Sequence, residues 1–314
     1  MKPSFAVRLI FSCACMSSLA CIAAPFAYVS NEKSGTVSII DTATDKVVAE
    51  MKAGAKPRGA AVSKDGKYLY VSDQPQNALQ VVDLETKEIA GKIDLGESPE
   101  GVSISPDGKW VVVASEIKNS IFFINTATRK VEFSVKVKGK NPEHAEFSPD
   151  AKRVYVSAED GDQVDIIDVA KREQVAQVTV GKRPRGIGFT PDGAYAYVAA
   201  ELASTVYVID TGSLKVVAEI KAGGFSNGVA VSGNRVYISN GKDGTVSCID
   251  AKQNKVIATI AVGKRPWNMA LTPDNKKLYV ASGRSNLVSV IDTDTNEKIL
   301  DIPVGELPWG VVIH

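Results

Sequence analysis

The sequence repeats itself seven times at a period of about 42 residues, and this repeat limits the possible folds more than any other feature. The box Tyr-Val-Ser, or a close variant of it, begins at residues 28, 70, 113, 155, 197, 237 and 279, so the spacings are 42, 43, 42, 42, 40 and 42 residues. Each copy must be one structural unit that buries its apolar surface against its neighbours. Seven copies account for almost all of the 314 residues.

Each copy is predicted to contain four short strands. In the first copy these are the Tyr-Val-Ser segment, Thr36–Asp41, Lys46–Met51 and Gly59–Ser63, which alternate in polarity and are rich in β-branched residues. Turn-forming triplets follow the fourth strand in most copies. They are Lys64-Asp-Gly66, Pro106-Asp-Gly108, Pro149-Asp-Ala151, Pro191-Asp-Gly193, Ser232-Gly-Asn234 and Pro273-Asp-Asn275. No segment of the repeat region has a helical period.

Repeats of this length with four strands are typical of the blades of a β-propeller. The sequence therefore predicts an all-β, seven-bladed propeller with four-stranded antiparallel blades. The first copy begins without the strand type that ends the others, and the chain ends with that type, Pro308-Trp-Gly-Val-Val-Ile-His314. We expect this last strand to complete the first blade and to close the ring.

The first 24 residues have the pattern of a secretory signal peptide. Lys2 and Arg8 precede an apolar run that ends in small residues at Ala23 and Ala24, and no acid occurs before Glu32. We therefore predict a signal peptide at 1–24, a propeller domain at 25–314, and a periplasmic or secreted protein without a membrane span in the mature chain. A retained membrane anchor and lipidation at Cys21 are the alternatives.

Charge and composition exclude several functions. The 37 basic and 36 acidic residues lack the basic excess of a dedicated nucleic-acid binder. Two basic segments, 181–186 and 263–267, are suited to phosphate contacts, but nucleic acid is not the expected partner of a chain with balanced charge. Two His, and Cys248 alone beyond the signal peptide, are too few for a zinc or haem site, so no cofactor and no metal are predicted. Cys248 is expected to be a small buried residue.

The repeated boxes resemble those of the YVTN-repeat propeller family over residues 26–314. They combine Tyr-Val-Ser-Asn, Val-Ile-Asp-Thr and Pro-Asp-Gly, or variants of these, at matched offsets. The segments Phe26–Lys33 and Pro308–Val312 resemble a subgroup found alongside bacterial alcohol oxidation systems that depend on pyrroloquinoline quinone. This resemblance implies a periplasmic accessory role, and the family supplies no agreed catalytic residues.

One position of the repeat is predicted to face a mouth of the central channel and to differ chemically between blades. It follows the Pro that begins the innermost strand, and Ser226 replaces that Pro once. Around the ring this position is occupied by Arg58, Glu100, Glu143, Arg185, Asn227, Trp267 and Trp309. The loops after the Tyr-Val-Ser strands are expected on the same face, and they bring Asn31, Glu32, Asp73, Glu116, Glu159, Glu201 and Asn240.

These residues predict a binding site rather than a catalytic one. Trp267 and Trp309 can stack on a planar ligand or anchor a protein partner, and the two arginines can pair with ligand carboxylates. The alternative is that the charges plug the mouth and satisfy one another, Arg58 with Glu100 and Arg185 with Glu143. Strand alternation predicts that His144 points away from Glu143, into the packing between blades.

Two further functions remain open. Oxygen atoms of Asn31, Glu100, Asn141, Glu143 and Asn227 are the type of ligand that Ca²⁺ prefers, which would suit a metal-dependent, lactonase-like hydrolase. A nucleic-acid-binding propeller is the other alternative. Motifs for a nucleophilic serine or a phosphate-binding loop are absent, so enzymatic activity is not predicted.

Overall fold

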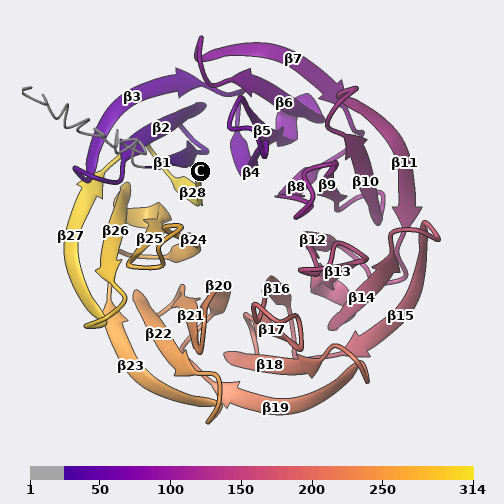
Figure 1. The fold of residues 1–314 in the computed structure, drawn as a ribbon, viewed down its shortest axis with the longest axis vertical. Helices are drawn as coiled ribbons and strands as arrows, with labels where there is room; N and C mark the ends of the chain where they lie inside the picture. Colours follow the sequence, from indigo (N-terminus) through magenta and orange to yellow (C-terminus); the bar gives the residue numbers. More distant parts are fainter. Residues whose placement is uncertain (1–24) are drawn as a thin grey trace, which may run out of the picture.

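The strands form seven separate four-stranded sheets around a central axis (Figure 1). The structure is a computed structural model that describes residues 25–314. Every sheet is antiparallel, and neighbouring strands within a sheet are also neighbours in sequence except at the junction of the two chain ends. The predicted seven-bladed propeller is therefore confirmed. The predicted signal peptide, residues 1–24, lies outside the described residues.

The blades are numbered here in chain order. Blade 1 contains β28 (Pro308–Ile313), β1 (Phe26–Asn31), β2 (Thr36–Asp41) and β3 (Lys46–Lys52). Blade 2 contains β4 (Pro57–Val62), β5 (Tyr68–Asp73), β6 (Ala78–Asp83) and β7 (Glu88–Asp94). Blade 3 contains β8 (Pro99–Ile104), β9 (Trp110–Ser115), β10 (Ser120–Asn125) and β11 (Lys130–Lys136), and blade 4 contains β12 (Pro142–Phe147), β13 (Arg153–Ala158), β14 (Gln163–Asp168) and β15 (Glu173–Thr179). Blade 5 contains β16 (Pro184–Phe189), β17 (Tyr195–Ala200), β18 (Thr205–Asp210) and β19 (Lys215–Lys221); blade 6 contains β20 (Ser226–Ser232), β21 (Arg235–Asn240), β22 (Thr245–Asp250) and β23 (Lys255–Ala261); blade 7 contains β24 (Pro266–Leu271), β25 (Lys277–Ser282), β26 (Leu287–Asp292) and β27 (Glu297–Pro303).

In the described part of the chain, residues 25–314, the helical elements are three single turns of 3-10 helix, η1 (Gln74–Gln76), η2 (Glu159–Gly161) and η3 (Gly283–Ser285). Each of them links the second and third strands of its blade. Within residues 25–314 there is no helix with the length and apolar character needed to span a membrane.

The last strand completes the first blade, as predicted. Strand β28 pairs with β1 in antiparallel register, with Val29 opposite Val311. Beyond the strand, the amide of Phe26 donates to the carbonyl of His314 at 2.9 Å, and the amide of His314 donates back at 3.1 Å. In Figure 1 the two ends of the colour scale meet in this blade. Ring closure thus depends on a strand from each terminus.

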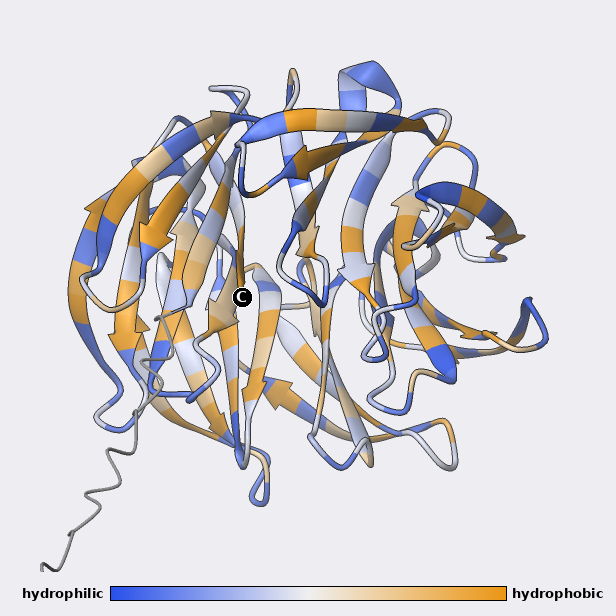
Figure 2. Cartoon of the chain, turned by 45° about the horizontal axis from the view of Figure 1, so that its top comes forward, coloured by the Kyte–Doolittle hydropathy of each residue, from blue (hydrophilic) through white to orange (hydrophobic). Residues whose placement is uncertain are grey.

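The apolar core is divided into seven clusters, and each cluster lies between two adjacent blades. Middle strands such as β2 and β14 are buried along most of their length, because both of their faces meet a neighbouring blade. Outer strands such as β15 alternate between exposed and half-buried positions, and Figure 2 shows the matching bands of hydropathy. Cys248 is fully buried in the cluster between blades 6 and 7, as expected.

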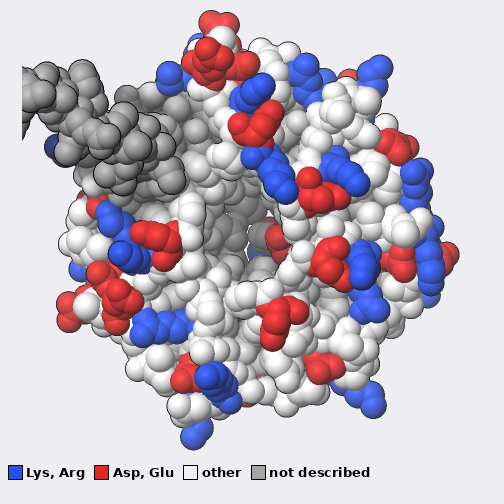
Figure 3. Space-filling model, in the orientation of Figure 1, with Lys and Arg blue, Asp and Glu red and all other residues white. Residues whose placement is uncertain are grey.

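Seven innermost strands surround the axis (Figure 1), and the molecule is hollowed there (Figure 3). These strands are β4, β8, β12, β16, β20, β24 and β28. Their first residues lie at one end of the channel, together with the loops that follow β1, β9, β13 and β17. Side chains from all seven blades therefore reach the same axial space.

Candidate functional site

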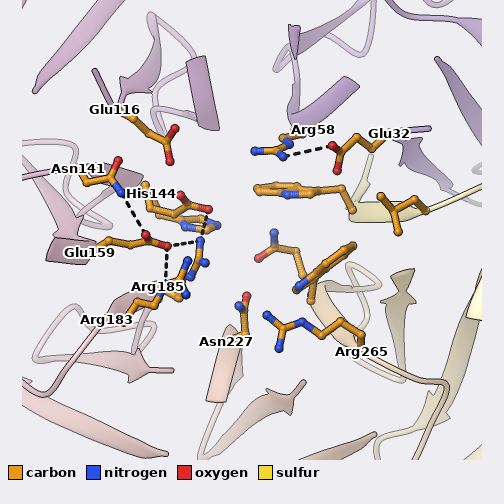
Figure 4. Close-up of a pocket in the computed structure, with 15 residues that line it drawn as sticks. Glu32, Arg58, Glu116, Asn141, His144, Glu159, Arg183, Arg185, Asn227 and Arg265 are labelled. Atoms are coloured by element: carbon orange, nitrogen blue, oxygen red, sulfur yellow. Dashed lines mark hydrogen bonds and ion pairs between the residues drawn. The ribbon is translucent and has the colours of Figure 1, made fainter. Parts of the chain in front are cut away.

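The position predicted from the repeat does converge on one cavity. A cavity of about 440 Å³ opens at this end of the channel and is lined by 15 residues (Figure 4). Six of the seven predicted residues are among them, namely Arg58, Glu143, Arg185, Asn227, Trp267 and Trp309. Glu100 is fully buried and does not line the cavity, because it lies behind the guanidinium of Arg58. We call this space the mouth cavity.

The first charged group in the mouth cavity is built around Arg58. Its guanidinium contacts Glu100 at 2.5 Å and Glu32 at 3.1 Å, and Gln74 donates a further hydrogen bond to Glu100. Burial and the nearby charge of Glu143 raise the pKa of Glu100 to about 9 in spite of Arg58. The guanidinium of Arg58 is shared between Glu100 and Glu32, and both acids raise its pKa against the effect of burial.

A second and larger group surrounds Arg185. Its guanidinium contacts Glu143 and Glu159 at 2.5 Å each and Glu201 at 3.0 Å. Arg183 also contacts Glu159 and Glu201, at 3.1 and 3.4 Å. This network joins blades 4 and 5, and Figure 4 shows Glu159, Arg183 and Arg185 gathered on one side of the cavity. The predicted alternative pairs, Arg58 with Glu100 and Arg185 with Glu143, are thus both present.

Arg265 extends the second network across blade 6. It reaches Glu201 at 2.6 Å, and its guanidinium lies 5.3 Å from the ring centroid of Phe225 and 5.9 Å from that of Trp267. Trp267 also packs closely against Gly283. These contacts hold the indole of Trp267 where it lines the mouth cavity.

Among the acids of residues 25–314 that line the cavity, Glu116 alone has no ion pair with an arginine. Ser98 donates a hydrogen bond to it at 2.6 Å. Burial, followed by the charge and hydrogen bond of Glu143, raises the pKa of Glu116 to about 7. In contrast, the pKa of Glu143 is lowered, because Arg185 outweighs the effect of burial. The cavity therefore contains one carboxyl group that changes protonation state near neutral pH.

His144 does not pack between blades, and that expectation was wrong. Its ring lies nearly parallel to Trp309, at 12° and 5.7 Å between centroids. The two residues belong to blades 4 and 1, so the pair spans the channel. The physical reason is a bulge: the register of β12 with β13 shifts between Pro142 and His144. Strict alternation is lost there, so both Glu143 and His144 line the mouth cavity.

A sequence signal for His144 exists in the repeat. The next ring position is Gly59, Gly101, Gly186, Gly228 and Gly310 in five blades but His144 and Asn268 in the other two. At Gly101 and Gly186 a Cβ would come within 2.6 Å of a carbonyl oxygen in the following blade. Close approach of the blades therefore favours glycine here, and the two exceptions place polar side chains in the channel. Comparing the copies position by position identifies both.

The predicted loop residues divide into two groups. Glu32, Glu116 and Glu159 line the mouth cavity, and Glu201 bonds to its arginines. The other three have structural contacts. Asn31 and Asn240 donate to hydroxyl groups of their own blades, and Asp73 accepts hydrogen bonds from the backbone amides of Ala55 and Lys56.

Three of the five predicted oxygen ligands for Ca²⁺, Asn141, Glu143 and Asn227, line the mouth cavity, whereas Asn31 and Glu100 do not. Asn31 is buried within blade 1, where its side-chain nitrogen donates to Ser38. Glu100 and Glu143 are each in contact with an arginine. Over residues 25–314 no group of three or more His, Cys, Asp or Glu side chains is arranged to hold a metal ion. A calcium site formed by this set is therefore not supported.

A family model described as "Lactonase, 7-bladed beta-propeller" matches residues 144–306, which is more than half of the sequence. The chain belongs to this lactonase family of seven-bladed β-propellers. A second model, the cytochrome D1 heme domain, matches residues 26–131. That segment does not fit a haem, because it contains neither His nor Cys and its single Met and three Tyr pack in or against the inter-blade core.

Solved structures agree with the fold of this lactonase-family propeller. Hydrazine synthase of Kuenenia stuttgartiensis is 26% identical, with a TM-score of 0.78 over 85% of this chain and 92% of that chain. Putative 6-phosphogluconolactonases from Bacteroides fragilis and Bacteroides uniformis are 21% and 20% identical. Their TM-scores are 0.78, over 93% and 92% of this chain and 98% and 99% of theirs. Among curated proteins no sequence matches this lactonase-family propeller.

Proposed function

We propose that this chain is a binding module that recognises a small, flat ligand with acid groups at the mouth cavity. One observation supports this proposal most strongly. Six residues of unlike chemistry stand at one equivalent position of the repeat and share a single open cavity of about 440 Å³. A purely structural role for this position would not call for two indoles, two guanidinium groups and an amide.

The chemistry of the cavity indicates the kind of ligand. An indole offers a large apolar face, and a guanidinium has five N–H donors in a planar fork that suits a carboxylate. Arg183 keeps 39% of its side chain exposed, and Arg58 keeps 25%. Donors therefore remain accessible although each arginine already has an acidic partner. A flat molecule with two or more carboxylates can contact both arginines and stack on Trp267 or Trp309.

We also propose a cellular location and an associated redox system for this binding module. The repeat boxes resemble the YVTN subgroup that accompanies alcohol oxidation dependent on pyrroloquinoline quinone, and residues 1–24 have the pattern of a signal peptide. We therefore place the protein in the periplasm, as an accessory of a quinone-linked redox system. Pyrroloquinoline quinone itself, a planar tricarboxylate, is a suitable first ligand to test.

The test is a titration of the purified mature protein with pyrroloquinoline quinone and with benzene-1,3,5-tricarboxylate, followed by calorimetry. The double variant Trp267→Ala with Trp309→Ala is expected to bind at least about 30-fold more weakly, the effect of losing a dominant contact. Tyr195→Ala, an exposed aromatic outside this cavity, serves as the matched control and should bind normally. Equal affinity of a folded double variant would refute the mouth cavity as the site.

A second candidate function is hydrolysis of a lactone without a metal ion. Two observations favour it, the lactonase family match and the pKa of Glu116 near 7 in the cavity. In this scheme Glu116 takes a proton from water as the water attacks the lactone carbonyl, and Arg185 stabilises the negative oxygen. The ring C–O bond then breaks, and the leaving oxygen receives the proton from Glu116.

Hydrolysis of 6-phosphogluconolactone measured against pH tests this candidate. The rate should rise through about pH 7, because only ionised Glu116 acts as a base, and Glu116→Gln should abolish the rise. Glu97→Gln, which changes a nearby glutamate outside the cavity lining, is the control. A wild-type protein that leaves the lactone unchanged would rule out this function while the binding proposal stands.

A further inference from the structure

The channel continues below the mouth cavity as a separate small chamber. This mid-channel chamber has a volume of about 150 Å³. His144 and Trp309 border both it and the mouth cavity, so their stacked rings separate the two. Glu146 borders both the chamber and a third cavity, of about 470 Å³, at the opposite end of the channel. We call the third space the far cavity.

Glu146 is an acidic residue at a position of the repeat that is otherwise small or aliphatic. The same ring position is occupied by small or aliphatic residues in the other six blades, namely Ala61, Ser103, Gly188, Ala230, Ala270 and Val312. Apart from His144, Asn268 and Trp309, the other walls of the chamber are glycine and aliphatic side chains, such as Val102 and Val229. Burial alone raises the pKa of Glu146 to about 8, with no hydrogen bond and no charge of the described residues acting on it.

His144 is a second polar group that borders the same chamber. Its ring lies beside the side chain of Asn268, which also lines the chamber and interacts with the imidazole. Burial lowers its pKa, against the effect of Glu143, so the imidazole is neutral. A buried polar group without a partner costs about 1 to 3 kcal/mol. Glu146 stands at a ring position where the other blades have small or aliphatic residues and has no partner of its own among residues 25–314, so a ligand can supply one.

The charged groups near Glu146 do not provide a counter-ion. Lys64 lies in the far cavity, but its ammonium donates to the carbonyl oxygen of Pro106 at 3.1 Å. His314 lies there too, and its Nε2 is 3.2 Å from the carbonyl oxygen of Lys64. The arginines of the mouth cavity lie beyond the ring pair and are bound by acids. A carboxylate in an apolar chamber is stable only when a cation joins it.

We propose that the mid-channel chamber binds a small primary amine, whose ammonium group pairs with the carboxylate of Glu146. The alkyl part lies against the aliphatic walls, and His144 and Trp309 close the chamber on the side of the mouth cavity. The amine enters from the far cavity, which Glu146 also lines. This site is distinct from the mouth cavity and does not depend on its proposed ligand.

The test compares n-butylamine with n-butanol, its neutral analogue of equal length, by calorimetry at pH 8. The wild type is expected to bind the amine and not the alcohol. Glu146→Gln should weaken amine binding at least tenfold, while Glu50→Gln, an exposed glutamate on the outer strand β3, should leave it unchanged. Trp267→Ala, which alters only the mouth cavity, should also leave it unchanged and thus separates this site from the first.

The pH dependence gives a readout that does not require a variant. Amine affinity should fall about tenfold per pH unit below pH 8, because Glu146 must lose its proton to pair with the ammonium group. His144, Lys64 and His314 face the same space, and protonation of His144 at lower pH acts in the same direction. Equal binding of amine and alcohol, or affinity that does not change between pH 6 and 8, would overturn the proposal.

Discussion

Replacing Glu146 with Gln should stabilise the protein, and increasingly so as the pH rises. The pKa of this carboxyl group is raised from its ordinary value of 4.5 to about 8 by burial. The folded state therefore holds the proton more tightly than the unfolded chain does, and stability contributed at low pH is lost between pH 4.5 and 8. Gln carries no ionisable proton, so the variant escapes this loss.

The magnitude follows from the two pKa values. At 1.36 kcal/mol per pH unit, the wild type loses almost no folding stability at pH 4, about 3 kcal/mol at pH 7 and about 5 kcal/mol at pH 9. Urea unfolding of the wild type and Glu146→Gln at these three pH values measures the difference between them. The change of that difference with pH is the quantity of interest, because an acid and an amide also differ by a constant amount.

A control and a clear negative result complete this experiment. Glu50→Gln alters an exposed glutamate on β3, and its difference from the wild type should stay within about 0.5 kcal/mol at every pH. If the free energies of unfolding of the wild type and Glu146→Gln run parallel from pH 4 to 9, Glu146 is not an isolated acid in the channel. The argument for the mid-channel chamber would then fail as well.

Three further predictions concern the ring and the charged network. Removing residues 308–314 takes strand β28 from the first blade and should lower the melting temperature by more than 10 °C; an unchanged melting curve would disprove closure by the two termini. Gly186→Ala places a Cβ 2.6 Å from a carbonyl oxygen of the next blade and should cost about 1 to 3 kcal/mol, whereas Gly91→Ala, with no atom within 4 Å, should cost little in urea unfolding. Arg185→Met leaves Glu143 buried without its main counter-charge and should destabilise the protein by about 3 to 5 kcal/mol at pH 7. The loss should be smaller at pH 4, because protonation of Glu143 removes the unpaired charge. Equal losses at both pH values would contradict the assigned pairing.

The architecture was predictable from the sequence because it depends on local and periodic information. Seven copies of a 42-residue unit, each with four alternating segments, leave few folds other than a closed ring of blades. The missing strand at one terminus and the extra strand at the other indicated the closure that β28 and β1 form. Equivalence of the copies also placed six of seven predicted residues in one cavity.

The ion pairs and the orientation of those residues depend on contacts between blades, which the repeat pattern does not show. Arg185 takes acids from two positions of the repeat in blades 4 and 5, so pairing by one position, Arg185 with Glu143, describes only part of its environment. The bulge between Pro142 and His144 breaks the alternation on which the expectation for His144 rested. A pattern of period two cannot show where that period is interrupted.

The sequence by itself determined the number of blades, the strands within them and the residues that ring the channel, because each follows from comparing one copy with the next. Only the tertiary structure decided how the channel is divided. The stacking of His144 on Trp309 and the isolation of Glu146 arise from side chains of blades far apart in the chain. They meet because the ring closes, and burial in that closed space, rather than residue type, sets the charge of each group.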